Sequence, residues 1–395
     1  MSQVDIKDRL TLPDQVNPTR GLIATGVVGL IASAIGYFLN HDQFFFSYLT
    51  SWVFYMSIAL AALFFVMLQH VTRSSWSVVV RRIPETLSYN ILPWAIFLIP
   101  VLFGMHTLYH WTHHSAVAHD PVLQGKTPWL NSTFFVVRQF IYFGIWGFLS
   151  YRLHKNSVKM DETGDWGLQT LLRRTSGPGI FIYAITVGFA SIDWLMTLDP
   201  HWYSTIFAVY FFSMSIQAFF AVMILMVFYL QSKGVLQQTI NRSHIYDLGI
   251  LLFGFSIFYA YIAFCQYLLI YYANLPEETV WFHHRLEHGY QGIALALLIG
   301  RFLIPFLVLL PKKMKSIKNV VIPISILILA VHFFELSWLV MPLLKEHGYS
   351  INWMDVTTFL GLGGIFFGLF FNKFRKHKII PENDPLLEQS VNKHL

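Results

Sequence analysis

The chain has 395 residues, of which 55% are hydrophobic and only 12% are charged. About a quarter of the residues of a soluble domain are charged, so this composition excludes a soluble globular protein and predicts a membrane protein. The formal net charge of +6 does not indicate a partner nucleic acid, because the basic residues lie at the ends of apolar stretches, where anionic lipid explains them better.

Ten stretches are long and apolar enough to cross about 30 Å of hydrocarbon as helices of about 20 residues each. They predict an all-α polytopic membrane protein with one transmembrane domain (1–395). The expected spans are 21–39, 44–69, 87–105, 132–151, 178–198, 203–230, 245–272, 284–310, 319–343 and 355–372. The tail 379–395 is polar and contains proline, so we expect it to be disordered or to dock on a partner.

Connections rich in lysine and arginine alternate along the chain with connections that have almost none. The two terminal segments and every second connection carry 22 of the 27 basic residues, and the remaining connections carry chiefly Lys126 and Lys345. Cytoplasmic connections collect positive charge. The pattern therefore predicts a multi-pass protein with both the N-terminus and the C-terminus in the cytoplasm.

Ionisable residues inside spans are costly and usually face the interior of the bundle. Depth along the spans predicts a charged layer near the outer face, made of Arg138, Asp193, Arg285, Glu287 and His288. A carboxylate and a histidine within reach of one quinol ring would accept its protons, which makes Asp193 and His288 candidates. Arg138 would tune the pKa of the carboxylate or donate a hydrogen bond to a quinone carbonyl. The alternative is that the arginines neutralise Asp193 or Glu287 and lock helices together.

Other polar residues lie deeper. His332 and Glu335 are three residues apart and share one helix face, so they are candidates for a proton path, or for hydrogen bonds to neighbouring helices. Asp247 and Arg301 fall at comparable depth and predict a structural ion pair. The single cysteine, Cys265, excludes an intrachain disulfide and a four-cysteine iron–sulfur site.

The strongest metal-like signal is the segment HTLYHWTHHSAVAH. Its spacing resembles the histidine boxes of membrane di-iron desaturases, and four of its imidazoles would share one face if it were helical. Such an enzyme needs further boxes on the cytoplasmic side, whereas this segment is expected outside. We therefore expect no metal and interpret its histidines as interfacial residues that pack against partner subunits: His106, His110, His113, His114 and His119.

Four strings together resemble a known family. They closely resemble the F-type membrane subunits of bacterial alternative complex III. The strings are ASIDWLMTLDPHWYSTIF (190–207), YHWTHH (109–114), DPVLQGKTPWLN (120–131) and FFVVRQFIYF (134–143). The resemblance covers nearly the whole chain, and SIDWLMTLDPHW is a specific string. These subunits belong to the polysulfide-reductase-like (NrfD-like) family of membrane quinone proteins.

The resemblance implies two four-helix bundles, about 44–198 and 203–343, flanked by the first and last spans. It implies a place in the bacterial inner membrane with a sister NrfD-like subunit, a periplasmic iron–sulfur subunit, multihaem cytochromes c and a terminal oxidase as partners. Haem c and iron–sulfur clusters would belong to those partners, and this chain would bind no cofactor covalently. The complex oxidises quinol, typically menaquinol, and the better supported quinol site of the family lies in the sister subunit.

The leading hypothesis is therefore a membrane subunit of a respiratory quinol-oxidising complex that contributes quinol contact, a proton path or both, and is not catalytic by itself. One alternative is a scaffold subunit without a quinone site. A secondary transporter would also have about ten spans, but its charges would cluster near mid-bilayer. A di-iron oxygenase that uses the histidine segment is the third alternative.

Overall fold

The computed structural model describes residues 11–287, 289–345 and 348–393. Within these ranges every regular element is helical and none is a strand. Ten of the described helices are long and apolar enough to cross a membrane. The predicted class, an all-α polytopic membrane protein, is therefore confirmed.

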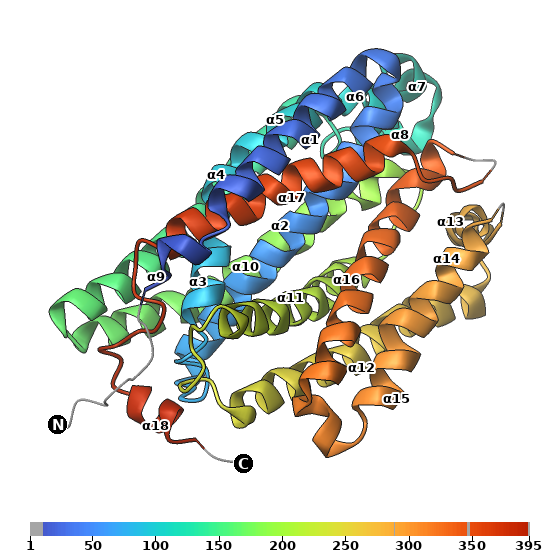
Figure 1. Ribbon diagram of the computed structural model, residues 1–395. Helices are drawn as coiled ribbons and strands as arrows, with labels where there is room; N and C mark the ends of the chain where they lie inside the picture. The colour runs from blue at the N-terminus through green and yellow to red at the C-terminus, as the bar shows by residue number, and fades with distance from the viewer. Residues whose placement is uncertain (1–10, 288, 346–347, 394–395) are drawn as a thin grey trace.

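The spans follow the predicted order (Figure 1). They are α1 (Thr19–Leu39), α2 (His41–Thr72), the run of α3 (Arg82–Tyr89), α4 (Ile91–Trp94) and α5 (Ile99–Phe103), α9 (Ser132–Thr163), α10 (Gly167–Trp194), α11 (Phe207–Ser232), α12 (Arg242–Ala273), α14 (Tyr290–Leu297) continued by α15 (Ile304–Leu309), α16 (Lys318–Val340) and α17 (Trp353–Phe374). Short helices α6 (Met105–Leu108), α7 (His114–His119), α8 (Pro121–Lys126), α13 (Pro276–Leu286) and α18 (Leu387–Val391) lie outside the spans.

Asparagine side chains begin several spans. Asn40, Asn131, Asn241 and Asn352 each accept a hydrogen bond from a backbone N–H group in the first turn of α2, α9, α12 and α17, respectively. These bonds satisfy N–H groups that a helix start leaves unpaired. At its other end α9 stops before Gly164, whose φ of +65° is a conformation that glycine adopts without steric cost.

The central helices are α2 and α11, which pack against each other. In each of them 89% of the apolar window is buried, more than in any other span. α3, α9 and α10 complete one group of four spans with α2, and α12, α14–α15 and α16 complete a second group with α11. The molecule is thus two four-helix groups joined through α2 and α11.

The first and last spans pack together along glycines. A Cβ atom added to Gly29 would lie 2.6 Å from the Cα of Gly361, and one added to Gly364 would lie 2.5 Å from the backbone N of Gly26. The two backbones are therefore in direct contact, as small residues allow between membrane helices. Because α17 also packs against α2, α1 and α17 form a flanking pair beside the first group (Figure 1).

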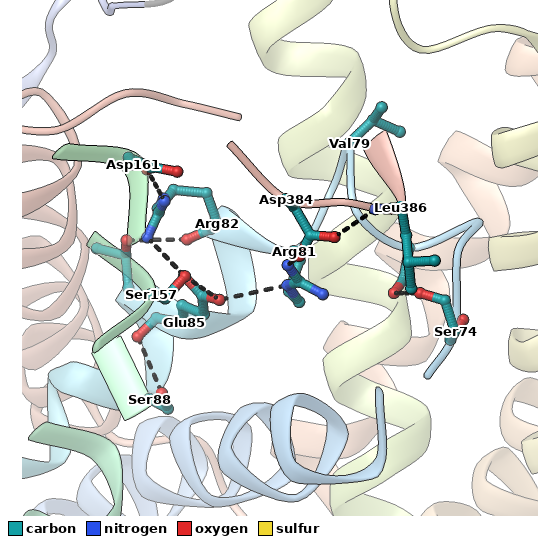
Figure 2. Close-up of polar contacts among 12 residues, drawn as sticks. Ser74, Val79, Arg81, Arg82, Glu85, Ser88, Ser157, Asp161, Asp384 and Leu386 are labelled. Atoms are coloured by element: carbon teal, nitrogen blue, oxygen red, sulfur yellow. Dashed lines mark hydrogen bonds and ion pairs between the residues drawn. The ribbon is translucent and has the colours of Figure 1, made fainter. Parts of the chain in front are cut away.

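The tail 379–395, as far as it is described, packs on its own chain, which corrects the expectation of disorder. Ile380 and Leu387 are buried. Asp384 forms an ion pair with Arg81 (Figure 2). The tail is polar in composition, but its few apolar side chains are buried and the carboxylate of Asp384 pairs with Arg81. Composition alone does not predict these contacts.

Figure 2 shows the buried ion network to which the tail is attached. Arg82 donates to Glu85 at 2.7 Å and also pairs with Asp161, and the Nε of Arg81 lies 3.4 Å from Glu85. Burial pulls the pKa of Arg81 down, but the carboxylates of Asp384 and Glu85 outweigh burial and raise it. The network joins α3, α9 and the tail.

The eighth span is shorter than the predicted range 284–310. α13 is a separate helix that starts at Pro276, and the span itself begins at Tyr290. Between them Gly289 has a φ of +89°, which breaks the helical path. Hydropathy places the end of a span only to within a few residues, so it did not separate the polar end of α13 from the apolar stretch that begins at Tyr290.

Candidate functional site

A buried carboxylate, Glu335 on α16, lies in the second group of spans with three donors around it. Arg301 forms an ion pair with its Oε2. The hydroxyl of Tyr259 on α12 donates to its Oε1 at 2.7 Å, and the hydroxyl of Tyr210 on α11 donates to the same oxygen. Both charged side chains are fully buried, so the carboxylate has the pairing and hydrogen bonds that a buried charge requires.

Arg301 lies in a π-helical segment, Leu298–Leu303, between α14 and α15. Such segments occur frequently at functional sites. The neighbouring Gly300 allows close packing on α16, since a Cβ there would lie 2.6 Å from the Cγ2 of Val331. The Nη2 of Arg301 also donates to the backbone oxygen of Met214 at 3.1 Å. The guanidinium thus connects α11 and α16.

His332 extends this cluster to α2. Its Nδ1 lies 2.9 Å from Nη2 of Arg301, and its Nε2 lies 3.0 Å from the hydroxyl of Ser57. Arginine only donates, so Nδ1 accepts, and the neutral ring carries its proton on Nε2 toward Ser57. His332 and Glu335 do share a face, but their closest N–O distance is 3.9 Å. The contact between them therefore runs through Arg301.

A cavity of about 470 Å³ adjoins the cluster. Tyr210 and Tyr259, whose hydroxyls donate to Glu335, are among its lining residues. Phe264 on α12 and Leu298 also line it, and they are 59% and 52% exposed. The cavity therefore opens between α12 and α14 onto the outward face of the spans, which in a bilayer meets lipid.

Gln266, which also lines the cavity, carries an unpaired polar atom. The residue is 3% exposed, and its Oε1 has no hydrogen-bond partner among the residues that the structure describes. An unpaired buried acceptor costs free energy, which a ligand hydroxyl would recover. A mostly apolar cavity with a few convergent polar groups is the usual form of a small-molecule site.

Arg138 and Asp193 form a second buried cluster, in the first group of spans. Nε and Nη2 of Arg138 donate to the two oxygens of Asp193 at 2.8 and 2.9 Å. Tyr142 donates to this carboxylate at 3.0 Å and Trp129 at 3.3 Å. Each oxygen thus accepts two hydrogen bonds, and this geometry favours the neutralising pair that the sequence left open as an alternative.

The other members of the predicted charged layer are placed differently. Glu287 follows α13 at a half-exposed position, and its carboxylate lies 3.3 Å from Nδ1 of His283. Arg285 is buried, donates to two backbone carbonyls at 3.0 Å each and lies 4.0 Å from the centre of the Trp281 ring. Burial lowers the pKa of Arg285 to about 9. His288 lies outside the described residues.

The predicted ion pair between Asp247 and Arg301 is wrong. Asp247 pairs with Lys393 at 2.5 Å, and Arg301 pairs with Glu335. Depth along a span gave the two residues a common level but not the direction of either side chain. The actual partner of Asp247 comes from the tail, for which the sequence predicted no structure on this chain.

The histidine segment folds as α6, a 3-10 turn (His110–Thr112) and α7 rather than as one helix. The rings of His106 and His113 stack at 3.8 Å, and Nε2 of His113 donates to the backbone oxygen of His106 at 2.8 Å. Nδ1 of His119 donates to a backbone oxygen at 2.8 Å. Across the described part of the chain, no three His, Cys, Asp or Glu side chains converge as a metal site would need.

The sequence did not identify Tyr210, Tyr259 and Gln266 as site residues. One signal was present: Tyr259 and Gln266 are seven residues apart, two helical turns, so they place polar atoms on one face of an apolar span. With 19 tyrosines in the chain, that signal is weak. The spacing of Tyr259 and Gln266 indicates a site only once the structure shows that Tyr259 donates to Glu335.

No model of a known protein family and no curated protein matches the chain.

Proposed function

We propose that this chain is an integral membrane subunit of a respiratory quinol-oxidising complex, of the alternative complex III kind, and that it binds quinol in the cavity beside Glu335. The observation that carries the proposal is a pair of tyrosines, Tyr210 and Tyr259, that line an apolar cavity and whose hydroxyls both donate to one buried carboxylate. The resemblance of residues 190–207 to the F-type subunits supports the same assignment.

The cavity has the features that a quinol needs. A quinol has a flat apolar ring, two hydroxyl groups and a long isoprenoid tail. The volume of about 470 Å³ lies within the usual range for small-molecule sites, and the opening toward lipid leaves a route for the tail. Phe282 and Trp338 are among the walls. The unpaired Oε1 of Gln266 would accept a hydrogen bond from one hydroxyl, and the tyrosines would meet the other.

Oxidation of the quinol to quinone releases two protons and two electrons. The hydroxyl of Tyr259 accepts a quinol proton as it passes its own to Glu335, so one proton moves from the ring to the carboxylate. Once neutral, Glu335 no longer holds Arg301, and Nδ1 of His332 is the next acceptor. His332 would then release its Nε2 proton toward Ser57, which frees the route for the second proton. The iron–sulfur and haem groups of partner subunits would be the oxidant that takes both electrons.

Because this chain would transfer protons and other subunits would transfer electrons, the proposal requires partner subunits. With one cysteine in the chain, a cluster held by four thiolates must belong to another subunit. We therefore propose an assembly with a sister NrfD-like subunit, an iron–sulfur subunit and multihaem cytochromes c, in contact with a terminal oxidase in the bacterial inner membrane. Menaquinol is the substrate that the resemblance favours.

Purification of the tagged chain in mild detergent, with a menaquinol-to-cytochrome assay, tests the proposal. Tyr259→Phe removes only the hydroxyl and should lower turnover about a hundredfold, the usual effect of losing a proton-transfer group. Tyr183→Phe is the matched control, since Tyr183 is a buried tyrosine of α10 in the other group, and it should leave turnover unchanged.

A cavity-filling variant tests binding separately. Ala263 lines the cavity, so Ala263→Phe should displace the quinol ring and raise the KM for quinol. Ile257→Phe adds bulk at an exposed position of α12 outside the lining and should not. Normal turnover in Tyr259→Phe together with an unchanged KM in Ala263→Phe would contradict the quinol site. The chain would then be a scaffold subunit without a quinone site. A chain that purifies without haem-bearing partners would contradict the respiratory assignment and favour a transporter.

A further inference from the structure

A second pocket, of about 400 Å³, lies where α3, α9 and α17 meet. Its polar lining is almost entirely basic. One carboxylate, that of Glu162, lies among three lysines and two histidines: His154, Lys155, Lys159, Lys373 and His377.

Aromatic rings position two of these lysines. The Nζ of Lys373 lies 4.2 Å from the centre of the Tyr89 ring, and the Nζ of Lys155 lies 5.4 Å from that of Tyr151. Among the described residues, neither lysine forms an ion pair. With three lysines and one carboxylate in its lining, the pocket keeps an excess of positive charge.

His154 provides an independent sign that a ligand is needed. It is 3% exposed, and neither ring nitrogen has a hydrogen-bond partner in the part of the chain that the structure describes. The rings of Tyr89 and His377 pack against it, with centroids 5.1 and 5.3 Å away. Buried polar groups nearly always have a partner, so the unpaired imidazole in this lining indicates a missing acceptor or donor.

The electrostatics of His377 agree with this interpretation. Burial, and then the positive charges of Lys373, Arg82 and Lys376, lower the pKa of His377 to about 4. A bound anion would oppose all three charges and raise that pKa again.

The position of the pocket indicates which anion it meets. The helices α3 and α9 extend beyond the predicted spans 87–105 and 132–151, but the apolar stretches themselves begin or end next to Tyr89, Tyr151 and Lys373. The ends of apolar stretches lie at the level of lipid headgroups. Tyr151 is 44% exposed, and Phe148, three residues before it on α9, is 57% exposed. An acyl chain would therefore find an apolar surface directly beside the basic pocket.

We propose that this pocket binds a phosphate group, and that an anionic phospholipid headgroup supplies it. Lys155, Lys159 and Lys373 compensate the phosphate charge, and a ring nitrogen of His154 donates to a phosphate oxygen. The site lies on the first group of spans and does not depend on the quinol cavity.

Native mass spectrometry and thermal unfolding of the full chain in detergent test the site. Phosphatidylglycerol should remain bound and raise the unfolding temperature, whereas zwitterionic phosphatidylcholine should not. The double variant Lys155→Gln/Lys159→Gln should weaken phosphatidylglycerol binding about tenfold or more. The control Lys312→Gln/Lys313→Gln removes the same charge from two exposed lysines between α15 and α16 and should bind as the wild type.

Three outcomes would overturn the proposal. Equal weakening in the control variant would show that binding follows net charge alone. Equal retention of phosphatidylcholine would show that the pocket does not select charge. Stabilisation by inorganic phosphate equal to that by phosphatidylglycerol would assign the site to free phosphate instead of lipid. The variant His154→Phe gives a further check, because it should reduce the preference for phosphatidylglycerol while all three lysines remain.

Discussion

At the scale of single residues, Glu335 and Arg301 depend on each other. Either Arg301→Met or Glu335→Gln alone leaves the remaining polar group without its charged partner in a fully buried position, which should cost about 3–5 kcal/mol. The double variant should lose clearly less than the sum of the two. The measurement is the free energy of unfolding in detergent, taken over the full double-mutant cycle.

A surface pair gives the control for that cycle. Asp247 and Lys393 pair at 2.5 Å, but their side chains are 19% and 33% exposed. Solvent screens such a pair, so Asp247→Asn should cost at most about 1 kcal/mol. Additive losses for Arg301 and Glu335 would contradict a direct coupling between them.

His377 makes stability depend on pH. Its pKa of about 4 in the folded chain lies below the value of about 6.5 for an unfolded chain. Between these values the unfolded state binds more protons, so stability should fall as the pH falls from about 6.5 to about 4. His377→Gln should lose less stability over this window, as measured by thermal unfolding at several pH values. His114→Gln, at an exposed position of α7, should follow the wild type.

The sequence identifies the buried ionisable residues but not their partners. Glu335, His332 and Arg301 stand out because charges inside spans are rare. Hydropathy gives the depth of a residue along its span, whereas pairing also depends on the direction of each side chain and on which helices are neighbours. For this reason depth alone pairs Arg301 with Asp247 instead of Glu335, and it does not identify the tyrosines that complete the site.

At the scale of helices, the contact between α1 and α17 requires glycine. A Cβ on Gly29 would lie 2.6 Å from the backbone of Gly361, so Gly29→Val should separate the helices and cost about 1–3 kcal/mol. The expected readout is a lower thermal unfolding midpoint. Gly254→Ala on α12 is the control, because nothing lies within 4 Å of the added atom. An unchanged midpoint in Gly29→Val would show that the two helices do not need this close approach.

Span positions are predictable because about 20 consecutive apolar residues have few alternatives to a membrane helix. Span ends are not predictable by the same argument. α9 continues to Thr163 instead of stopping near residue 151, since Gly164 ends the helix, and α13 separates from the eighth span at Gly289. Local caps and backbone conformation decide these boundaries, and hydropathy does not measure either.

At the scale of the whole molecule, two features lie on different groups of spans. The proposed quinol cavity is formed by α11, α12, α14 and α16, whereas the basic pocket is formed by α3, α9 and α17. The contact between the two groups runs through α2 and α11, and Ser57 on α2 holds His332 on α16 at 3.0 Å. A proton that reaches His332 is therefore at the boundary between the two groups.

The charge distribution predicts the orientation of the molecule, and this prediction can be tested directly. Ten spans would place both termini on the same side of a bilayer, and the termini and the connections of that side would carry 22 of the 27 basic residues, which predicts that this side is cytoplasmic. In a Cys265→Ser background, Ser115→Cys in α7 should react with a membrane-impermeant maleimide on intact cells. Lys313→Cys should react only after the membrane is opened. The reverse pattern would place the termini outside, and would also move the basic pocket to the outer leaflet, where anionic phospholipid would have to be present for it to bind.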